Sequence, residues 1–307
     1  MKKLIAVALI AIAGYWAWTS PTAGAWIYAN ATDAEASFYG LEQQTVDIGE
    51  LKMEAYVGGP EDKPAIVMIH GFSSDKDVWP RFSKHFVEDY RVVIPDLAGH
   101  GDTGYQAEWD YSAPAQATRV ALLLDKLGIE NVHVIGNSMG GFITAWFARL
   151  YPERTITAAP VDPAGLDFPV LSTMHQMIEK GKNPFFVHNQ EEFELFYGLT
   201  MEKPPFLPPS VIAATGEMYI ERREELRHIE GSFYHHDWLT EELQHIQTPT
   251  LVMWGSGDQI LHASAGPVWE SKLPNGKLHV FEGIGHMPMV EIPAETAQVY
   301  RAFIEAQ

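Results

Sequence analysis

The stretch Gly136-Asn137-Ser138-Met139-Gly140-Gly141 decides the fold, because it places a serine between glycines at the junction of two different patterns. The apolar run at 132–135 precedes it and is typical of a buried strand, and an amphipathic run that ends near Leu150 follows it and is typical of a helix. A strand, a sharp turn and a helix with serine at the apex form the G-x-S-x-G pattern of a serine nucleophile. We expect glycine at 136 and 140 because side chains there would collide where the strand and the helix pass close together.

Other runs along the chain are apolar on both faces, as expected of strands buried inside a parallel sheet. Helical patterns lie between them, and this alternation predicts an α/β fold with a doubly wound, mostly parallel sheet. The expected buried strands are residues 65–69, 91–95, 131–135, 155–161, 250–254 and 277–281. The expected helices are residues 79–88, 112–127, 138–151, 263–272 and 293–304. An antiparallel hairpin of residues 45–48 and 51–57 precedes them.

The alternation breaks from residue 165 to residue 236, where many phenylalanines and methionines occur at helical spacing between prolines. The pairs Pro204-Pro205 and Pro208-Pro209 interrupt these patterns, which predicts a helical insertion over the sheet. The expected domain organisation is an N-terminal membrane segment at 1–32, a core formed by 40–164 and 237–307, and a helical cap or lid at 165–236.

Composition and charge exclude several classes of function. The chain has 21 Lys+Arg against 40 Asp+Glu, a formal net charge of −19, whereas a protein that binds nucleic acid needs a basic face. The acidic surplus is spread along the chain and indicates solvated faces. The sequence contains no cysteine, which excludes disulfides, thiolate metal sites and a cysteine nucleophile.

The N-terminal segment has the features of a membrane-targeting segment. Lys2-Lys3 precede residues 4–32, among which none is charged. Such a stretch is long enough to cross a bilayer, and the two lysines predict an N-terminus inside and a catalytic domain outside the cytoplasm. Small residues at 23–25 and 29–31 offer an alternative, a signal-peptide cleavage site that would release a periplasmic or secreted protein. Of the two, we favour a retained membrane anchor.

The predicted serine nucleophile needs a base within hydrogen-bond reach and a carboxylate that orients this base. In open α/β sheets such groups gather at the carboxyl ends of the strands. Asp258 follows the strand at 250–254 and His286 follows the strand at 277–281, in the order Ser, Asp, His that accompanies this serine pattern. We therefore predict Ser138, Asp258 and His286 as catalytic residues. Asp162, directly after the strand at 155–161, is a competing candidate for the acid.

Acyl transfer also needs N–H donors for the oxyanion. Met139, at the start of the helix, and Phe72, in the loop after the strand at 65–69, are the candidate backbone donors. His70 beside them is expected to make structural hydrogen bonds. The thirteen histidines show no metal-site spacing, and the predicted chemistry requires neither a metal nor a cofactor.

Five groups of residues together resemble the α/β-hydrolase superfamily over about residues 45–305, and they occur in the order of that family. Within it, residues 70–76, Gly136-Asn137-Ser138 and the N-terminal apolar span are similar to membrane-anchored monoacylglycerol lipases and related bacterial lipases and esterases. The resemblance implies the same triad, with Ser138 as nucleophile, and the same oxyanion donors. The five groups are His70-Gly71-Phe72 with Trp79, residues 96–101, residues 136–141, residues 254–258, and residues 285–288 with 291–293.

These observations predict a serine carboxylester hydrolase that acts on a small-molecule or lipid ester, with monoacylglycerol lipase as the narrower hypothesis. Other chemistry occurs on the same scaffold with a serine nucleophile, namely hydrolysis of a carbon–carbon bond, perhydrolase or peroxidase chemistry, and aminopeptidase activity. A non-catalytic ligand receptor is the alternative from a different class, and an intact set of Ser138, Asp258 and His286 disfavours it.

Overall fold

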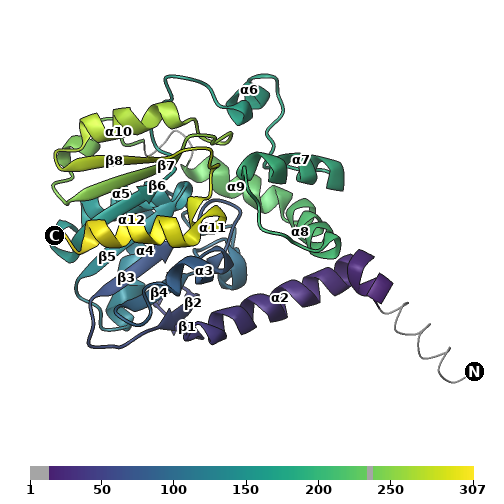
Figure 1. Cartoon of the computed structure of the whole chain (residues 1–307), viewed down its shortest axis with the longest axis horizontal. Helices are drawn as coiled ribbons and strands as arrows, with labels where there is room; N and C mark the ends of the chain where they lie inside the picture. The colour runs from purple at the N-terminus through teal and green to yellow at the C-terminus, as the bar shows by residue number, and fades with distance from the viewer. Residues whose placement is uncertain (1–13, 234–237) are drawn as a thin grey trace, which may run out of the picture.

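The computed structural model describes residues 14–233 and 238–307 (Figure 1). Its centre is an eight-stranded sheet in the order β1-β2-β4-β3-β5-β6-β7-β8. The pairs β1·β2 and β2·β4 are antiparallel, and the other neighbours are parallel. The strands are β1 (Leu41–Asp47), β2 (Lys52–Gly58), β3 (Ala65–Ile69), β4 (Arg91–Pro95), β5 (Val132–Asn137), β6 (Thr155–Val161), β7 (Thr250–Gly255) and β8 (Gly276–Phe281). The predicted α/β class with a doubly wound, mostly parallel sheet is confirmed.

Helices cover both faces of the sheet (Figure 1). Helices α4, α5 and α10 contribute to the apolar core on one face, and α3 and α12 contribute to the core on the other. The helices are α2 (Pro21–Phe38), α3 (Pro80–Ser83), α4 (Ala113–Lys126), α5 (Met139–Leu150), α6 (Thr173–Glu179), α7 (Gln190–Thr200), α8 (Pro209–Glu221), α9 (Arg223–Phe233), α10 (Gly266–Lys272), α11 (Pro288–Glu291) and α12 (Pro293–Ile304).

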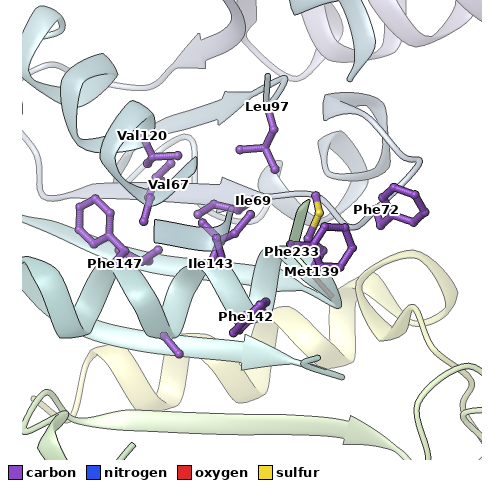
Figure 2. Packing of buried hydrophobic residues seen from close by; sticks show 14 of the residues in the cluster. Val67, Ile69, Phe72, Leu97, Val120, Met139, Phe142, Ile143, Phe147 and Phe233 are labelled. Atoms are coloured by element: carbon purple, nitrogen blue, oxygen red, sulfur yellow. The ribbon is translucent and has the colours of Figure 1, made fainter. Parts of the chain in front are cut away.

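Strand β3 shows why these runs are apolar throughout. All five of its residues are buried, and alternate side chains enter different cores, with Val67 in one and Met68 in the other. Figure 2 shows Phe142 and Phe147 of α5 on the side of the sheet where Val67 lies. β3 pairs with β4 on one side and β5 on the other, so chain connections diverge at this point of the sheet. Ligands of open α/β sheets bind at such a switch point, beyond the carboxyl ends of the strands.

Helix α3 has four residues, which is shorter than the predicted helix at 79–88. Pro80 begins it, but beyond Ser83 the backbone makes tighter turns, in which the Phe86 N–H donates to the Ser83 carbonyl oxygen at 2.8 Å. These turns keep Phe82 and Phe86 in the same core with their ring centroids 5.1 Å apart. Both apolar side chains therefore still reach the core, although the predicted helix does not continue beyond Ser83.

The predicted helical insertion is present as α6 to α9, between β6 and β7. Figure 1 shows α7, α8 and α9 beyond one end of the sheet, away from the C-terminus. The two ends of the insertion meet where the Leu239 N–H donates to the Gly165 carbonyl oxygen at 2.9 Å. Its own core includes Phe196, whose ring centroid lies 5.5 Å from that of Tyr219. The division of the chain into domains at 165 and 236 stays a prediction.

Helix α2 runs from the N-terminal segment to β1 and packs against α8 (Figure 1). At this contact a Cβ on Gly24 would lie 1.9 Å from the Ser210 carbonyl oxygen, so a side chain at position 24 would force the helices apart. The Ser210 hydroxyl donates to the Ala17 carbonyl oxygen at 2.7 Å. Near the other end of α2, the Tyr56 hydroxyl donates to the Asp33 carboxylate at 2.8 Å, which ties the helix to the sheet.

The predicted membrane segment at 1–32 lies partly outside the described residues, which begin at residue 14. Residues 14–19 are helical, and Ser20 then caps α2, which has Pro21 as its first residue. Within 14–233 and 238–307, no helix combines the length and the apolar character needed to span a bilayer. Residues 21–32 of the predicted apolar stretch belong to a helix that packs on protein and continues to Phe38.

Candidate active site

Ser138 occupies the turn between β5 and α5 in a strained backbone conformation, with φ 59° and ψ −118°. At this turn α5 passes very close to β5 and to the end of β3. A Cβ on Gly136 would lie 2.2 Å from the Gly140 carbonyl oxygen, and a Cβ on Gly140 would lie 2.2 Å from the Ile69 carbonyl oxygen. Both glycines are therefore required for the steric reason that the sequence pattern predicts.

Backbone hydrogen bonds hold Ser138 at the end of the neighbouring strand. Its N–H donates to the Val161 carbonyl oxygen at 2.9 Å. Its carbonyl oxygen accepts from the N–H groups of Phe142 at 3.0 Å and Ala164 at 3.2 Å. The side chain is thus presented from a backbone fixed on both sides, as a preorganised nucleophile requires.

His286 and Asp258 are joined by a hydrogen bond across two adjacent strand ends. Asp258 follows β7, His286 follows β8, and His286 Nδ1 donates to Asp258 Oδ2 at 2.7 Å. The exposed fraction is 7% for the His286 side chain and 0% for the Asp258 side chain, so water competes little for this bond. Donation from Nδ1 leaves Nε2 of the neutral ring as an acceptor. The backbone N–H groups of Ile260 and Leu261 donate to Asp258 Oδ1 at 2.8 and 2.9 Å and fix the carboxylate.

Asp162, the competing acid, makes different bonds. Its Oδ1 accepts from the Gly255 N–H at 2.8 Å, and its own N–H donates to the Met253 carbonyl oxygen at 2.8 Å. Burial and the charge of Asp258 raise the pKa of Asp162 well above its usual range. Among the described residues, the carboxylate hydrogen-bonded to the His286 ring is that of Asp258.

The loop after β3 lies directly against the serine. A Cβ on Gly71 would be 3.2 Å from the Ser138 Cβ, so the loop that carries Phe72 borders the sharp turn at Ser138 between β5 and α5, which we call the elbow. His70 supports this loop, since its Nε2 accepts from the Leu97 N–H at 3.0 Å and its Nδ1 then donates to the Gly71 carbonyl oxygen at 2.8 Å. His70 therefore makes the structural hydrogen bonds that the sequence analysis expects.

Asn137 is a site residue that the sequence reasoning missed. Its Nδ2 donates to the His286 carbonyl oxygen at 2.9 Å and approaches the Val161 carbonyl oxygen at 3.3 Å. The side chain is buried, so these carbonyl groups depend on it. Asn137 lies inside the glycine-rich stretch, but its partner is 149 positions away and no spacing in the sequence points to it.

Glu291 belongs to one of the five groups noted in the sequence but had no role assigned to it, and it fastens the His286 loop to the insertion. Its Oε1 accepts from the Gly285 N–H at 2.8 Å, and its Oε2 accepts from the N–H groups of Glu202 at 3.0 Å and Lys203 at 2.8 Å. The His286 N–H donates to the Thr200 carbonyl oxygen at 3.0 Å. The loop is thus held from the side of α7 as well as from the sheet.

Ser138 and His286 both line a cavity of about 460 Å³. Its wall is mostly apolar and includes the loops that carry Ser138 and His286, helices α7 and α8, and helix α2, which contributes Tyr28 and Ala31. A polar patch interrupts the wall where Asp75 lies, and burial together with the charge of Asp77 raises the pKa of Asp75 to about 8. A smaller cavity of about 50 Å³ also borders Ser138, beside Phe233 and Leu261.

One group of three carboxylate and histidine side chains within 14–233 and 238–307 is close enough to share an ion, with potential ligand atoms within 4.8 Å of one another. It consists of Asp162, Asp258 and His286. Two of these three side chains are already bonded to each other through His286 Nδ1, so the geometry is that of a hydrogen-bonded relay. The buried cluster is accordingly suited to proton transfer.

Comparison with known proteins places this geometry in a family. Residues 64–293 match the alpha/beta hydrolase fold family. Lipase 1 of Psychrobacter immobilis is 34% identical over 275 residues, which cover 87% of this chain and 86% of the relative. The mouse monoacylglycerol lipase ABHD6 is 28% identical over 265 residues, or 81% of this chain and 78% of the relative.

A solved structure agrees over the whole chain. The crystal structure of a membrane phospholipase A, described as a bacterial virulence factor, superposes with a TM-score of 0.89 at 33% identity and covers 100% of this chain and 99% of that one. The similarity thus includes the N-terminal helix and the insertion as well as the sheet. Sequence match, sheet order and elbow geometry agree, and the chain belongs to the α/β-hydrolase family.

Proposed function

We propose that this protein hydrolyses carboxylic esters of lipids through a covalent acyl-enzyme on Ser138, with monoacylglycerols as the narrowest candidate substrates. The observation that carries the proposal is the 2.7 Å bond between His286 and Asp258 at a cavity that Ser138 also lines. The chain is a carboxylic ester hydrolase, in keeping with relatives named Lipase 1, monoacylglycerol lipase and membrane phospholipase A.

In the proposed mechanism His286 Nε2 removes the proton from the Ser138 hydroxyl as the serine oxygen attacks the ester carbonyl carbon. His286 then donates that proton to the leaving alcohol, and an acyl group remains on Ser138. Water activated by the same nitrogen attacks the acyl carbonyl and releases the acid. Asp258 holds Nδ1 protonated and stabilises the positive ring that forms in each step.

The oxyanion of each tetrahedral intermediate is assigned to the backbone N–H groups of Phe72 and Met139. Two observations support this assignment. Gly71 places the Phe72 loop against Ser138, and Met139 is the first residue of α5, where N–H groups have no partner within the helix. Donors fixed by a strand end and a helix start need little reorganisation during the reaction, which is the main source of such stabilisation.

The large cavity is the proposed acyl site, and the helical insertion at 165–236 is the proposed cap over it. A volume of about 460 Å³ suits a lipid-sized ligand, since small-molecule sites span roughly 300–1,000 Å³. Phe193, Phe196 and Met218 of the insertion line it, and such aromatic and thioether side chains adapt to a flexible acyl chain.

The N-terminal segment is proposed to attach the enzyme to a membrane, with the catalytic part outside the cytoplasm. Lys2-Lys3 support this orientation, although they lie outside the described residues. Exposed aromatic side chains support the attachment, since Trp16 is 54% exposed, Trp26 67% and Phe206 78%. Trp18 stacks on Phe206 with ring centroids 6.2 Å apart, so the N-terminal segment and the cap share this aromatic surface. Tryptophan is enriched at membrane interfaces.

A fluorophosphonate probe tests the serine chemistry. We expect one covalent label on the full chain that Ser138→Ala abolishes and that Ser256→Ala, on an exposed loop, retains. A folded protein that takes no label would instead favour a non-catalytic receptor. Asp258→Asn should lower kcat about 10⁴-fold because the imidazole tautomer is no longer fixed.

The substrate class is tested with p-nitrophenyl esters of increasing chain length, monoacylglycerols and phospholipids. We expect hydrolysis of the p-nitrophenyl esters and of at least one monoacylglycerol. Activity on a peptide or on a vinylogous diketone, with neither ester class cleaved, would assign the site to one of the rival chemistries of this scaffold.

A further inference from the structure

The catalytic scheme gives Asp162 no role, although this residue is fully buried beside the site. Its exposed fraction is 0%, and no N–H or O–H group of residues 14–233 and 238–307 donates a hydrogen bond to its Oδ2 atom. Its backbone has φ 44°, a conformation that is unusual outside glycine, asparagine and aspartate. A buried oxygen without a donor costs about 1–3 kcal/mol, so the protein needs a way to satisfy it.

The nearest candidate partner is the carboxylate of Asp258. Asp162, Asp258 and His286 offer nitrogen and oxygen atoms that all lie within 4.8 Å of one another. Two carboxylates this close in a buried site cannot both be ionised, because their like charges repel where little water screens them. One of the two therefore holds a proton, and that proton allows a hydrogen bond between the Asp162 and Asp258 side chains.

The surrounding donors decide which carboxyl group holds the proton. Asp258 accepts three hydrogen bonds, from the Ile260 N–H, the Leu261 N–H and the His286 ring, all of which favour the charged form. Asp162 accepts one, from the Gly255 N–H. Burial and then the charge of Asp258 raise the pKa of Asp162, and a hydrogen bond to Asp258 raises it further, whereas the Gly255 N–H opposes them. The charge therefore resides on Asp258 and the proton on Asp162.

We propose that Asp162 is a neutral carboxylic acid during catalysis and donates a hydrogen bond from Oδ2 to the Asp258 carboxylate, as a positioning residue behind the proposed triad. The added donor withdraws negative charge from Asp258. The loss of kcat/KM on the acid side should therefore lie at a lower pH than it would without this donor. This inference rests on the proposed role of Asp258, whereas the proposed function does not depend on Asp162.

The inference is tested with two substitutions whose new residues can adopt the positive φ of position 162. Asp162→Asn keeps an oxygen for the Gly255 N–H and a neutral donor for Asp258, so kcat at neutral pH should stay within a few-fold of wild type. Asp162→Gly tolerates the backbone conformation but removes both groups. We expect it to lower kcat at least tenfold and to raise the pH at which half of kcat/KM is lost on the acid side.

Two further measurements distinguish a neutral hydrogen-bond donor at Asp162 from a residue with only a structural role. Ionisation of Asp162 should add a loss of kcat/KM on the alkaline side in wild type, and that component should be missing in Asp162→Asn. The infrared difference spectrum between wild type and Asp162→Asn at neutral pH should contain the C=O stretching band of a protonated carboxylic acid. Because the two proteins differ only at this position, other carboxyl groups cancel in the difference.

The inference fails if Asp162→Asn reduces kcat tenfold or more, since a neutral isostere would then not replace the residue. It fails equally if the difference spectrum shows a carboxylate in place of the acid band. A full kcat in Asp258→Asn would instead contradict the proposed triad, so the two failures are distinguishable.

Discussion

Asn137 Nδ2 donates to the His286 carbonyl oxygen at 2.9 Å, so the residue before the proposed nucleophile holds the residue that carries the proposed base. Asn137→Ala should lower kcat about tenfold or more, because an unsatisfied buried carbonyl costs roughly 1–3 kcal/mol and the His286 loop would shift to find another donor. Steady-state kinetics on a short p-nitrophenyl ester measure this loss. Asn131→Ala, at an exposed position, is the matched control and should retain wild-type kcat. Equal kinetics of the two variants would show that this bond does not position the base.

The contact between α2 and α8 should be sensitive to a single methyl group. Gly24→Ala places a Cβ where only 1.9 Å separates it from the Ser210 carbonyl oxygen, so the helices must move apart. We expect a lower Tm and a greater loss of activity on long-chain than on short-chain esters, because α2 lines the cavity. Gly198→Ala in α7 is the control, since its Cβ meets no other atom within 4 Å and alanine favours a helix. A Gly24→Ala protein as stable as Gly198→Ala would contradict the tight packing.

Lys76 should be far more important to stability than other lysines. Its Nζ lies 2.9 Å from Asp96, whose carboxylate is fully buried, and 2.7 Å from Asp102. Burial alone would lower the pKa of Lys76, but the Asp96 charge and the hydrogen bonds to Asp96 and Asp102 together outweigh it, and the pKa is raised. Lys76→Met should reduce the free energy of unfolding by about 3–5 kcal/mol, because the Asp96 charge is left buried without its cation. Urea denaturation measures the change.

The control for this prediction is Lys63→Met, at an exposed position before β3. We expect its free energy of unfolding to lie within about 0.5 kcal/mol of wild type, as is usual for surface substitutions. A Lys76→Met protein no less stable than this control would show that the ion pair with Asp96 does not stabilise the fold.

His133 in β5 should contribute to a loss of stability in acid. Burial lowers the pKa of His133 to about 4, whereas an unfolded histidine titrates near its ordinary value of about 6.5. The unfolded state therefore binds more protons in this range, and the stabilising contribution present above about pH 6.5 declines as the pH falls towards 4. His133→Gln should flatten this dependence when urea midpoints at pH 5 and pH 7.5 are compared. An identical pH dependence in both proteins would contradict the prediction.

The sheet could be predicted from the sequence because its central strands are buried on both faces. Residues 65–69 and 91–95 were predicted with the bounds that β3 and β4 have, since an apolar run between turn residues is typical of a buried parallel strand. The bounds of β5 differ, because it continues through Asn137 into the elbow. The short α3 differs for another reason, as its apolar spacing is equally compatible with consecutive tight turns.

The site was readable only in part. Ser138, Asp258 and His286 could be singled out because each follows a predicted strand, and their catalytic roles stay predictions. Asn137 could not be assigned a role, because its partner depends on the distance between two loops in the folded chain. The contact of α2 with α8 could not be predicted, since an uncharged run that faces lipid has the same composition as one that packs on a neighbouring helix.

The contribution of α2 to the cavity wall has a consequence for the exchange of segments between related enzymes. Tyr28 and Ala31 precede the first strand, yet they border the same space as Phe196 and Tyr219, which lie far along the chain. Because this cavity is the proposed acyl site, substitutions in α2 as well as in the insertion should change substrate choice. A chimera that takes α2 from one such enzyme and the remaining chain from another should keep the reaction and lose the selectivity.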